Sequence, residues 1–267
     1  MMLNFHFSLN TPKIVPNNLD ATINYGILFL IVLFAVIFQF VLTFVFDSDD
    51  QYIIISIISF TNPLIAAVVA FVIAHRYKNS HVFGRSYLLL SLSFFSVFLG
   101  EIIYLIYDLV LKVEPYPSIA DVFFFAYSPF LTAHLIFNIR FFQSSIKLIT
   151  KLWISAIPVT IVVFYVLFSL YEIDEINFDF YYGTVFVLAT SITLTFTILG
   201  TKIFKKGVLG KSWLILLFGI LALTFADDWY YYLETFGGYD LTHPVNILWY
   251  AGYWIVVYAL IKHKEII

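Results

Sequence analysis

Eight long apolar runs occupy most of this chain and leave it few ways to fold. A helix needs about 20 residues to cross the hydrocarbon core of a bilayer, because each helical residue advances about 1.5 Å. Each run is close to that length. We therefore predict an all-α integral membrane protein with eight transmembrane helices. The predicted spans are residues 25–46, 52–74, 87–111, 119–141, 152–171, 180–204, 213–234 and 245–261.

The composition argues against a soluble fold. Of the 267 residues, 62% are hydrophobic and only 12% are charged, whereas a soluble domain carries about 25% charged residues. An apolar surface of this extent needs the bilayer as its solvent. The net charge of −3, without a basic stripe or arm, argues against a nucleic-acid partner. Cysteine is absent, which excludes disulfides and thiolate metal sites.

The basic residues predict the orientation. All but one of the 14 Lys and Arg residues fall in the two tails or in the loops after the second, fourth and sixth spans, and the exception is Lys112. Cytoplasmic loops collect Lys and Arg. We therefore expect a multi-pass protein of the cell membrane with both termini in the cytoplasm. Residues 1–24 are interpreted as a polar cytoplasmic tail, because they lack the pattern of a secretory signal peptide.

The chain also shows an internal duplication. Segment 100–108 resembles segment 226–234, and the same offset maps the first and second spans onto the fifth and sixth. We predict two four-helix repeats, residues 25–142 and 151–262, within a single membrane domain. Because four is even, the repeats share one orientation and are related by an axis along the membrane normal. The matched residues are Glu101 with Asp227, Tyr104 with Tyr230, and Asp108 with Glu234.

Acids within the spans are the best indication of function, since each costs roughly 2.5–3.5 kcal/mol to insert. The matched residues recur at i, i+3 and i+7, so each set lines one helix face. Apart from Arg140 and Lys202 at their predicted cytoplasmic ends, the spans contain no Lys or Arg, so none is available to neutralise these acids. We expect an acidic, tyrosine-lined pocket open to the extracytoplasmic side, balanced by protons, a hard cation or a cationic organic ligand. The predicted pocket residues are Glu101, Tyr104, Asp108, Asp121, Asp227, Asp228, Tyr230 and Glu234.

Each acid also has a structural interpretation. Glu101 and Asp227 can be protonated and hydrogen-bonded to hydroxyls of neighbouring helices, while Asp108 and Glu234 can face water at helix ends. Asp121 follows Ser118 by three residues, which is the spacing of a capping box at the start of the fourth span.

His243 lies in an outer loop beside the predicted pocket and is a candidate metal ligand, although a lone loop histidine is more often solvated. No motif requires a cofactor: the sequence lacks a Walker loop, a dinucleotide glycine fingerprint, HExxH and a nucleophile elbow. We therefore expect a protein that is not an enzyme.

Residues 115–130, PYPSIADVFFFAYSPF, carry a family resemblance. The run Pro-Ser-x-Ala-Asp-x-Phe, after a span with an internal acid, resembles multi-span regions found ahead of diguanylate cyclase or histidine kinase domains in some bacteria and archaea. The family pattern continues to Gly/Phe-Tyr-Pro, from which Tyr127-Ser128-Pro129 departs by one inserted residue. The resemblance implies a membrane sensory input module. Because this sequence ends soon after the last span, we expect its signal to pass to a partner.

Three functions remain open at this point. The first is a membrane-embedded sensor or ligand-binding module that signals through a partner. The second is a proton- or cation-coupled transporter or channel, since parallel repeats with intramembrane acids fit such coupling. The third and weakest is an intramembrane enzyme that uses paired acids.

Overall fold

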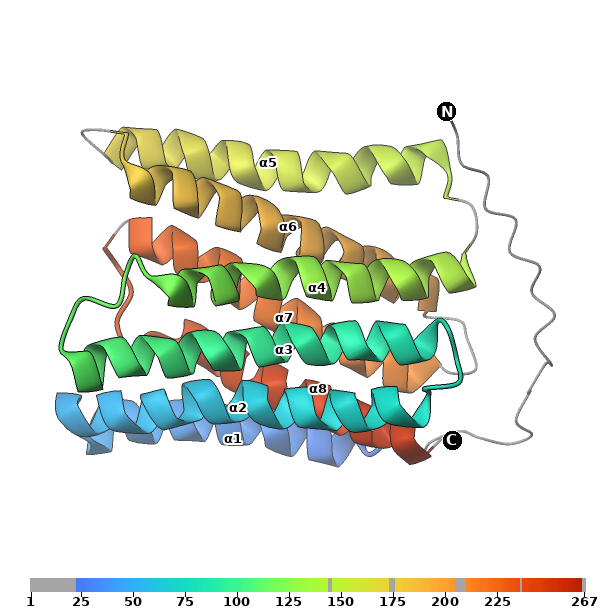
Figure 1. Ribbon diagram of the computed structural model, residues 1–267, viewed down its shortest axis with the longest axis horizontal. Helices are drawn as coiled ribbons and strands as arrows, with labels where there is room; N and C mark the ends of the chain where they lie inside the picture. The colour runs from blue at the N-terminus through green and yellow to red at the C-terminus, as the bar shows by residue number, and fades with distance from the viewer. Residues whose placement is uncertain (1–22, 144–145, 173–175, 205–209, 236, 266–267) are drawn as a thin grey trace.

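The computed structural model describes residues 23–143, 146–172, 176–204, 210–235 and 237–265, and eight long helices fill most of these ranges (Figure 1). All eight predicted spans are confirmed, and each helix is long and apolar enough to cross a membrane. The helix α3 continues into a wider π-helical turn, Ile106–Leu111. The helices are α1 (Tyr25–Val45), α2 (Ser48–Arg76), α3 (Phe83–Leu105), α4 (Ile119–Phe142), α5 (Leu148–Glu172), α6 (Phe178–Phe204), α7 (Gly210–Thr235) and α8 (Val245–Glu265).

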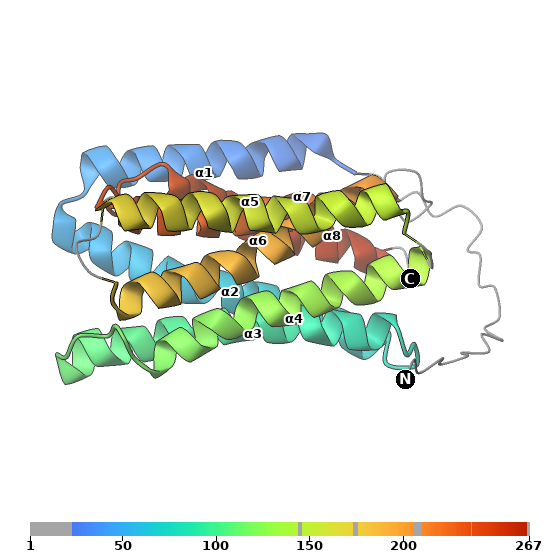
Figure 2. The same cartoon turned by 90° about the horizontal axis from the view of Figure 1, so that it is seen from above.

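Six of the helices form a closed ring. Each packs against the next in the order α2, α3, α4, α6, α7, α8, and α8 packs back against α2. The other two stand outside the ring: α1 packs against α8, and α5 packs chiefly against α6, so they lie at opposite edges of the bundle (Figures 1 and 2). In this order α3 and α7 occupy opposite positions of the ring.

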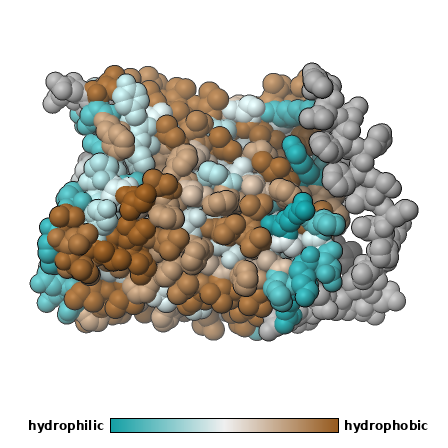
Figure 3. Space-filling model, viewed as in Figure 1, coloured by the Kyte–Doolittle hydropathy of each residue, from teal (hydrophilic) through white to brown (hydrophobic). Residues whose placement is uncertain are grey.

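The outer surface is that of a membrane protein. Apolar side chains cover the middle of the bundle, and hydrophilic residues gather toward its two ends (Figure 3). The outer helices α1 and α5 carry many of the exposed large apolar side chains, among them Phe29, Phe34, Phe164 and Leu167. A hydrocarbon solvent accounts for this exposure, which would be costly in water.

Charge divides the two ends of the bundle. At the end where the odd-numbered helices begin, here called the basic end, lie all the described basic residues except Lys112. The acidic end carries Asp47, Asp49, Asp50 and the acidic residues of the other loops. Most of the predicted N-terminal tail, together with Lys205 and Lys206, falls outside the described residues. The basic-end residues are Arg76, Lys78, Arg85, Arg140, Lys147, Lys151, Lys202, Lys211, Lys262 and Lys264.

Short polar side chains determine where helices begin. The Asn24 side chain accepts hydrogen bonds from the backbone N–H groups of Gly26 and Ile27, and Asp47 caps α2 in a similar way. These contacts satisfy first-turn donors that have no partner within the helix. Asn24 also donates its own backbone N–H to the Tyr258 hydroxyl at 2.8 Å, which ties the start of α1 to α8.

Two glycines allow α7 and α8 to pack closely. A Cβ atom at Gly219 would lie 2.7 Å from Val256 Cγ2 and 2.9 Å from the Val256 backbone nitrogen. A Cβ atom at Gly252 would lie 2.8 Å from the Leu223 side chain. Small residues at such crossings bring helix backbones together, and packing then replaces the hydrophobic driving force that is missing in lipid.

Replacing Gly219 with Ala should therefore push α7 away from α8. Overpacking of this kind costs about 1–3 kcal/mol, so we expect Gly219→Ala to lower the apparent melting temperature, followed by circular dichroism of the purified protein. Gly238→Ala is the matched control, because its new Cβ atom would meet nothing closer than 3.8 Å. An equal fall in both variants would contradict this account of the crossing.

Candidate functional site

A cavity of about 840 Å³ lies inside the ring and extends to its acidic end. All six ring helices line it, and residues of the connecting segments at the acidic end, such as Glu114 and Tyr239, line it as well. Its deepest lining residues include Asn62 on α2 and Val97 on α3. Asn62 lies 14 residues from the start of α2 at Ser48, and Val97 lies 14 residues from Leu111, where the π-helical turn after α3 ends. At about 1.5 Å per residue, each is about 20 Å from the acidic end. The cavity is therefore a deep cup that opens at the acidic end.

The lining is acidic and aromatic. At least eleven tyrosines contribute to it, and among its described lining residues none is Lys, Arg or His. Carboxylates placed together in a poorly solvated site cannot all stay ionised without a counter-charge. The cup can therefore accommodate a positive charge, and its described lining residues do not provide one. Its six carboxyl groups belong to Glu101, Glu114, Asp121, Asp179, Asp227 and Glu234.

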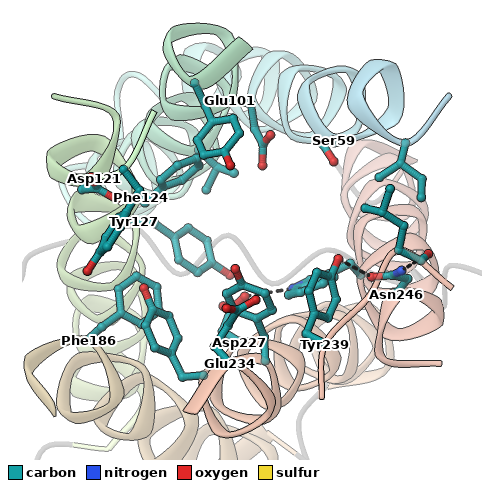
Figure 4. A pocket seen from close by; sticks show the side chains of 18 of the residues that line it. Ser59, Glu101, Asp121, Phe124, Tyr127, Phe186, Asp227, Glu234, Tyr239 and Asn246 are labelled. Carbon is teal, nitrogen blue, oxygen red and sulfur yellow. Dashed lines mark hydrogen bonds between the residues drawn. The ribbon is translucent and has the colours of Figure 1, made fainter. Parts of the chain in front are cut away.

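The two deepest acids face each other. Glu101 projects from α3 and Asp227 from α7, so they enter the cavity from opposite walls, with Glu234 on the wall of Asp227 (Figure 4). Tyr104 and Tyr230, which the sequence places one turn from these acids, also line the cavity. The structure thus brings Glu101, Tyr104, Asp227, Tyr230 and Glu234 to one cavity.

The two opposed acids differ in their partners. The indole N–H of Trp249 on α8 donates a hydrogen bond to Asp227 Oδ1 at 2.9 Å. The Glu101 carboxylate has no hydrogen-bond partner among the residues that the structure describes, and it faces the cavity (Figure 4). Asp227 is therefore held in place by the protein, whereas Glu101 is free to meet a ligand.

Asp121 is both a helix cap and a lining residue. Its Oδ2 accepts the backbone N–H of Ser118 at 2.6 Å, and the Ser118 hydroxyl accepts the N–H of Ala120, so the predicted capping box is confirmed. Its other carboxylate oxygen accepts a long hydrogen bond, 3.4 Å, from the Tyr182 hydroxyl of α6. The cap therefore anchors the start of α4 to the next helix of the ring.

Two predicted pocket residues are not among those that line the cavity. Asp108 accepts a hydrogen bond from the Tyr52 hydroxyl of α2 and is not a lining residue. Its placement on the Glu101 face assumed a regular α-helix, but the π-helical turn rotates each residue less, so the i+7 position moves off that face. Asp228 accepts a hydrogen bond from the Thr190 hydroxyl of α6, as its rotation of about 100° from Asp227 requires.

His243 takes part in the start of α8. Its Nδ1 accepts the backbone N–H of Val245 at 3.1 Å, and its ring meets the Trp229 ring edge-on, with centroids 5.5 Å apart. Among the described residues, no group of three or more His, Asp or Glu side chains is placed to hold a metal ion.

Hydrogen bonds near the mouth of the cup were not evident from the sequence. The Tyr116 hydroxyl donates to Asp179 Oδ1 at 2.9 Å, and burial together with that carboxylate raises the pKa of Tyr116. Burial raises the pKa of Tyr239 to about 12, helped by the nearby Glu234 carboxylate, and its hydroxyl donates to Asn246 at 3.2 Å. Both hydroxyls therefore stay protonated near neutral pH. These partners lie on different elements, and no local spacing pattern indicates them.

The chain matches no protein-family model, no curated protein and no solved structure with which it was compared.

The hydrogen bond between Trp249 and Asp227 can be tested by substitution. Trp249→Phe keeps an aromatic ring but removes the N–H donor, which leaves a half-buried carboxyl group without it. Loss of one partner of such a group costs about 1–3 kcal/mol, so we expect a lower apparent melting temperature in nanodiscs. Trp254→Phe is the control, because 41% of the Trp254 surface is exposed. Equal melting temperatures for the two variants would refute a role for this bond in stability.

Proposed function

We propose that this protein is a membrane-embedded sensor whose cup binds a cation from the extracytoplasmic side. The observation that carries this proposal is a deep cavity with six carboxyl groups and no basic side chain among its described lining residues. With the basic end in the cytoplasm, as the distribution of Lys and Arg favours, the cup faces outward at the cell membrane. Electrostatic attraction would then concentrate cations at its mouth.

The lining favours an organic cation over a hard metal ion. Ca²⁺ takes six to eight oxygen ligands at close range, whereas the acids of the cup are spread over opposite walls (Figure 4). A cation held over a tyrosine or tryptophan face gains about 0.5–1 kcal/mol at an exposed site and about 2 kcal/mol when it is desolvated. The many aromatic side chains around Glu101 and Asp227 suit such a ligand, and the uncommitted Glu101 carboxylate supplies its counter-charge.

A signalling role fits the closed floor of the cup. Large buried side chains, including Tyr87, Leu90, Trp213 and Leu216, fill the ring between the cup and the basic end. A ligand in the cup would therefore shift helices rather than pass straight through. The resemblance of residues 115–130 to sensory input regions supports the same role, with a cytoplasmic or membrane partner that receives the signal.

We also propose that the ring consists of two parallel repeats. Around the ring, α2, α3 and α4 are followed by α6, α7 and α8. Each contact between neighbouring helices therefore has a counterpart on the opposite side of the ring, for example α2 with α3 and α6 with α7. Near the basic end, Asn138 donates to the His134 carbonyl at 2.8 Å, and His263 Nδ1 bonds the Ala259 carbonyl at 2.7 Å. Each residue of the second pair follows its counterpart in the first by 125 residues (263 − 138 and 259 − 134), one less than the 126 that separate Glu101 from Asp227. The same 125 residues separate Asp121 from Asn246 at the starts of α4 and α8.

Binding of a small cation tests the proposal. We expect choline to bind the nanodisc-reconstituted protein and its neutral isostere, 3,3-dimethylbutan-1-ol, to bind far more weakly. Glu101→Gln should weaken choline binding about tenfold or more, which corresponds to about 1.4 kcal/mol. Asp228→Asn is the matched control, since Asp228 is turned toward α6. Equal binding of choline and the isostere would contradict the proposal.

A flux measurement separates the sensor from a coupled transporter, which intramembrane acids also favour. Proteoliposomes should bind labelled choline without accumulating it, because the core below the cup blocks a continuous path. Uptake that is abolished by the double variant Glu101→Gln, Asp227→Asn would replace the sensor with the transporter.

A further inference from the structure

A second cavity, of about 550 Å³, lies between α1, α2 and α8 on the outer side of the ring. Its walls are apolar, with Ile27, Phe34 and Phe38 from α1 facing Ile57 and Ile65 from α2, and Trp254 from α8. We call this cavity the lateral groove. It exists because α1 packs against α8 and makes no comparable contact with α2, whereas α5 packs directly against α6.

The lateral groove adjoins the acidic cup. Ile58, Asn62 and Tyr250 line both cavities, so a single layer of side chains separates them. Two of these residues are polar, although the groove is otherwise almost wholly apolar. The Tyr250 side chain is only 8% exposed, and its hydroxyl has no hydrogen-bond partner in the described part of the chain. A buried hydroxyl of this kind is costly unless something occupies the space beside it.

The backbone of α2 is weakened at the same place. Pro63 follows Asn62 inside the helix and has no N–H, so the carbonyl of Ser59 loses its partner one turn earlier. Ser59 lines the cup (Figure 4). Proline within a membrane helix is a common place for a bend. The wall between groove and cup therefore includes the part of α2 whose helical hydrogen bonding is incomplete.

We infer that this wall is a lateral entrance, through which a single-chain amphipathic cation reaches the cup from the bilayer. Its charged head would lie in the cup with Glu101 as counter-ion, and its alkyl chain would lie in the lateral groove. The chemistry of the two cavities is complementary to the two ends of such a molecule: one is acidic and aromatic, and the other is apolar. This inference rests on the proposed function and names the class of its ligand.

The test compares two cations in lipid nanodiscs, with dodecyltrimethylammonium displacing labelled choline. Thr61 lines the groove but not the cup, so Thr61→Phe fills the groove and leaves the cup unchanged. Val68→Phe, at a position that is 53% exposed and lines neither cavity, is the matched control on the same helix. Partition of the long-chain probe into the bilayer is the same for every variant, so differences between variants report on the groove.

We expect Thr61→Phe to raise the half-displacing concentration of dodecyltrimethylammonium about tenfold and to change choline affinity less than about twofold. Val68→Phe should change neither. If choline binds but dodecyltrimethylammonium displaces it at the same concentration from the wild type and from Thr61→Phe, the lateral entrance is refuted and the cation site in the cup is retained. If choline does not bind the wild-type protein at all, both the lateral entrance and the proposed cation site are refuted.

Discussion

The structure depends on how a ring of membrane helices accommodates carboxyl groups around a cavity whose described lining residues include no Lys, Arg or His. An ionised carboxylate in a poorly solvated interior needs a hydrogen-bond donor, a positive charge or a proton. Most of the acids within the spans are given a donor by a neighbouring helix: Asp108 by Tyr52, Asp228 by Thr190, and Asp227 by Trp249. Each of these bonds also ties two neighbouring helices of the ring together, although Asp228 Oδ2 is left without a partner among the described residues.

Glu101 is the exception. It lies at the depth of Asp227 on the opposite wall, and the described part of the protein gives it no donor. In the proposed pair of repeats, the counterpart of Trp249 is Phe124, which has no N–H to donate and packs its ring against the position of Gly100. The difference between an indole and a phenyl ring therefore leaves one acid satisfied and the other available. In the proposed function, Glu101 would be the carboxylate that a bound cation compensates most directly, with the other carboxyl groups of the cup contributing to the attraction.

Much of the fold could be predicted from the sequence, because span length and hydropathy are local properties of a chain in a bilayer. The capping box of Ser118 and Asp121 is local in the same sense, and its spacing predicts it. The shared face of Glu101 and Tyr104 follows from regular helix geometry. The position of Asp108 could not be predicted in this way, because the helix widens into a π-helical turn just before it and no residue in that stretch indicates the change.

Contacts between helices could not be predicted in this way. The donor for Asp227 comes from Trp249 on α8, and the pairing depends on how closely α7 and α8 pack at Gly219 and Gly252. Nor does hydropathy indicate that α4 packs on α6 while α5 stands outside the ring, since all three are apolar enough to span. Closure of the ring is decided by long-range packing, and the cup exists only once the ring has closed.

The two outer helices pack differently against the two halves of the ring. The ring order is the same in both halves, yet α5 lies against α6 while α1 lies against α8 and leaves α2 uncovered. The side left uncovered is the one where Pro63 lies within α2 and where Asn62 and Tyr250 line both the lateral groove and the cup. The unpartnered Glu101 lies on α3, and α2, which carries two of the three side chains shared by the two cavities, is the next helix of the ring. In the proposed sensor, the unpartnered Glu101 and the side of the ring that α1 leaves open would lie in the same half. The second half, in which Trp249 holds Asp227 and α5 packs closely against α6, would then provide the rigid side of the site.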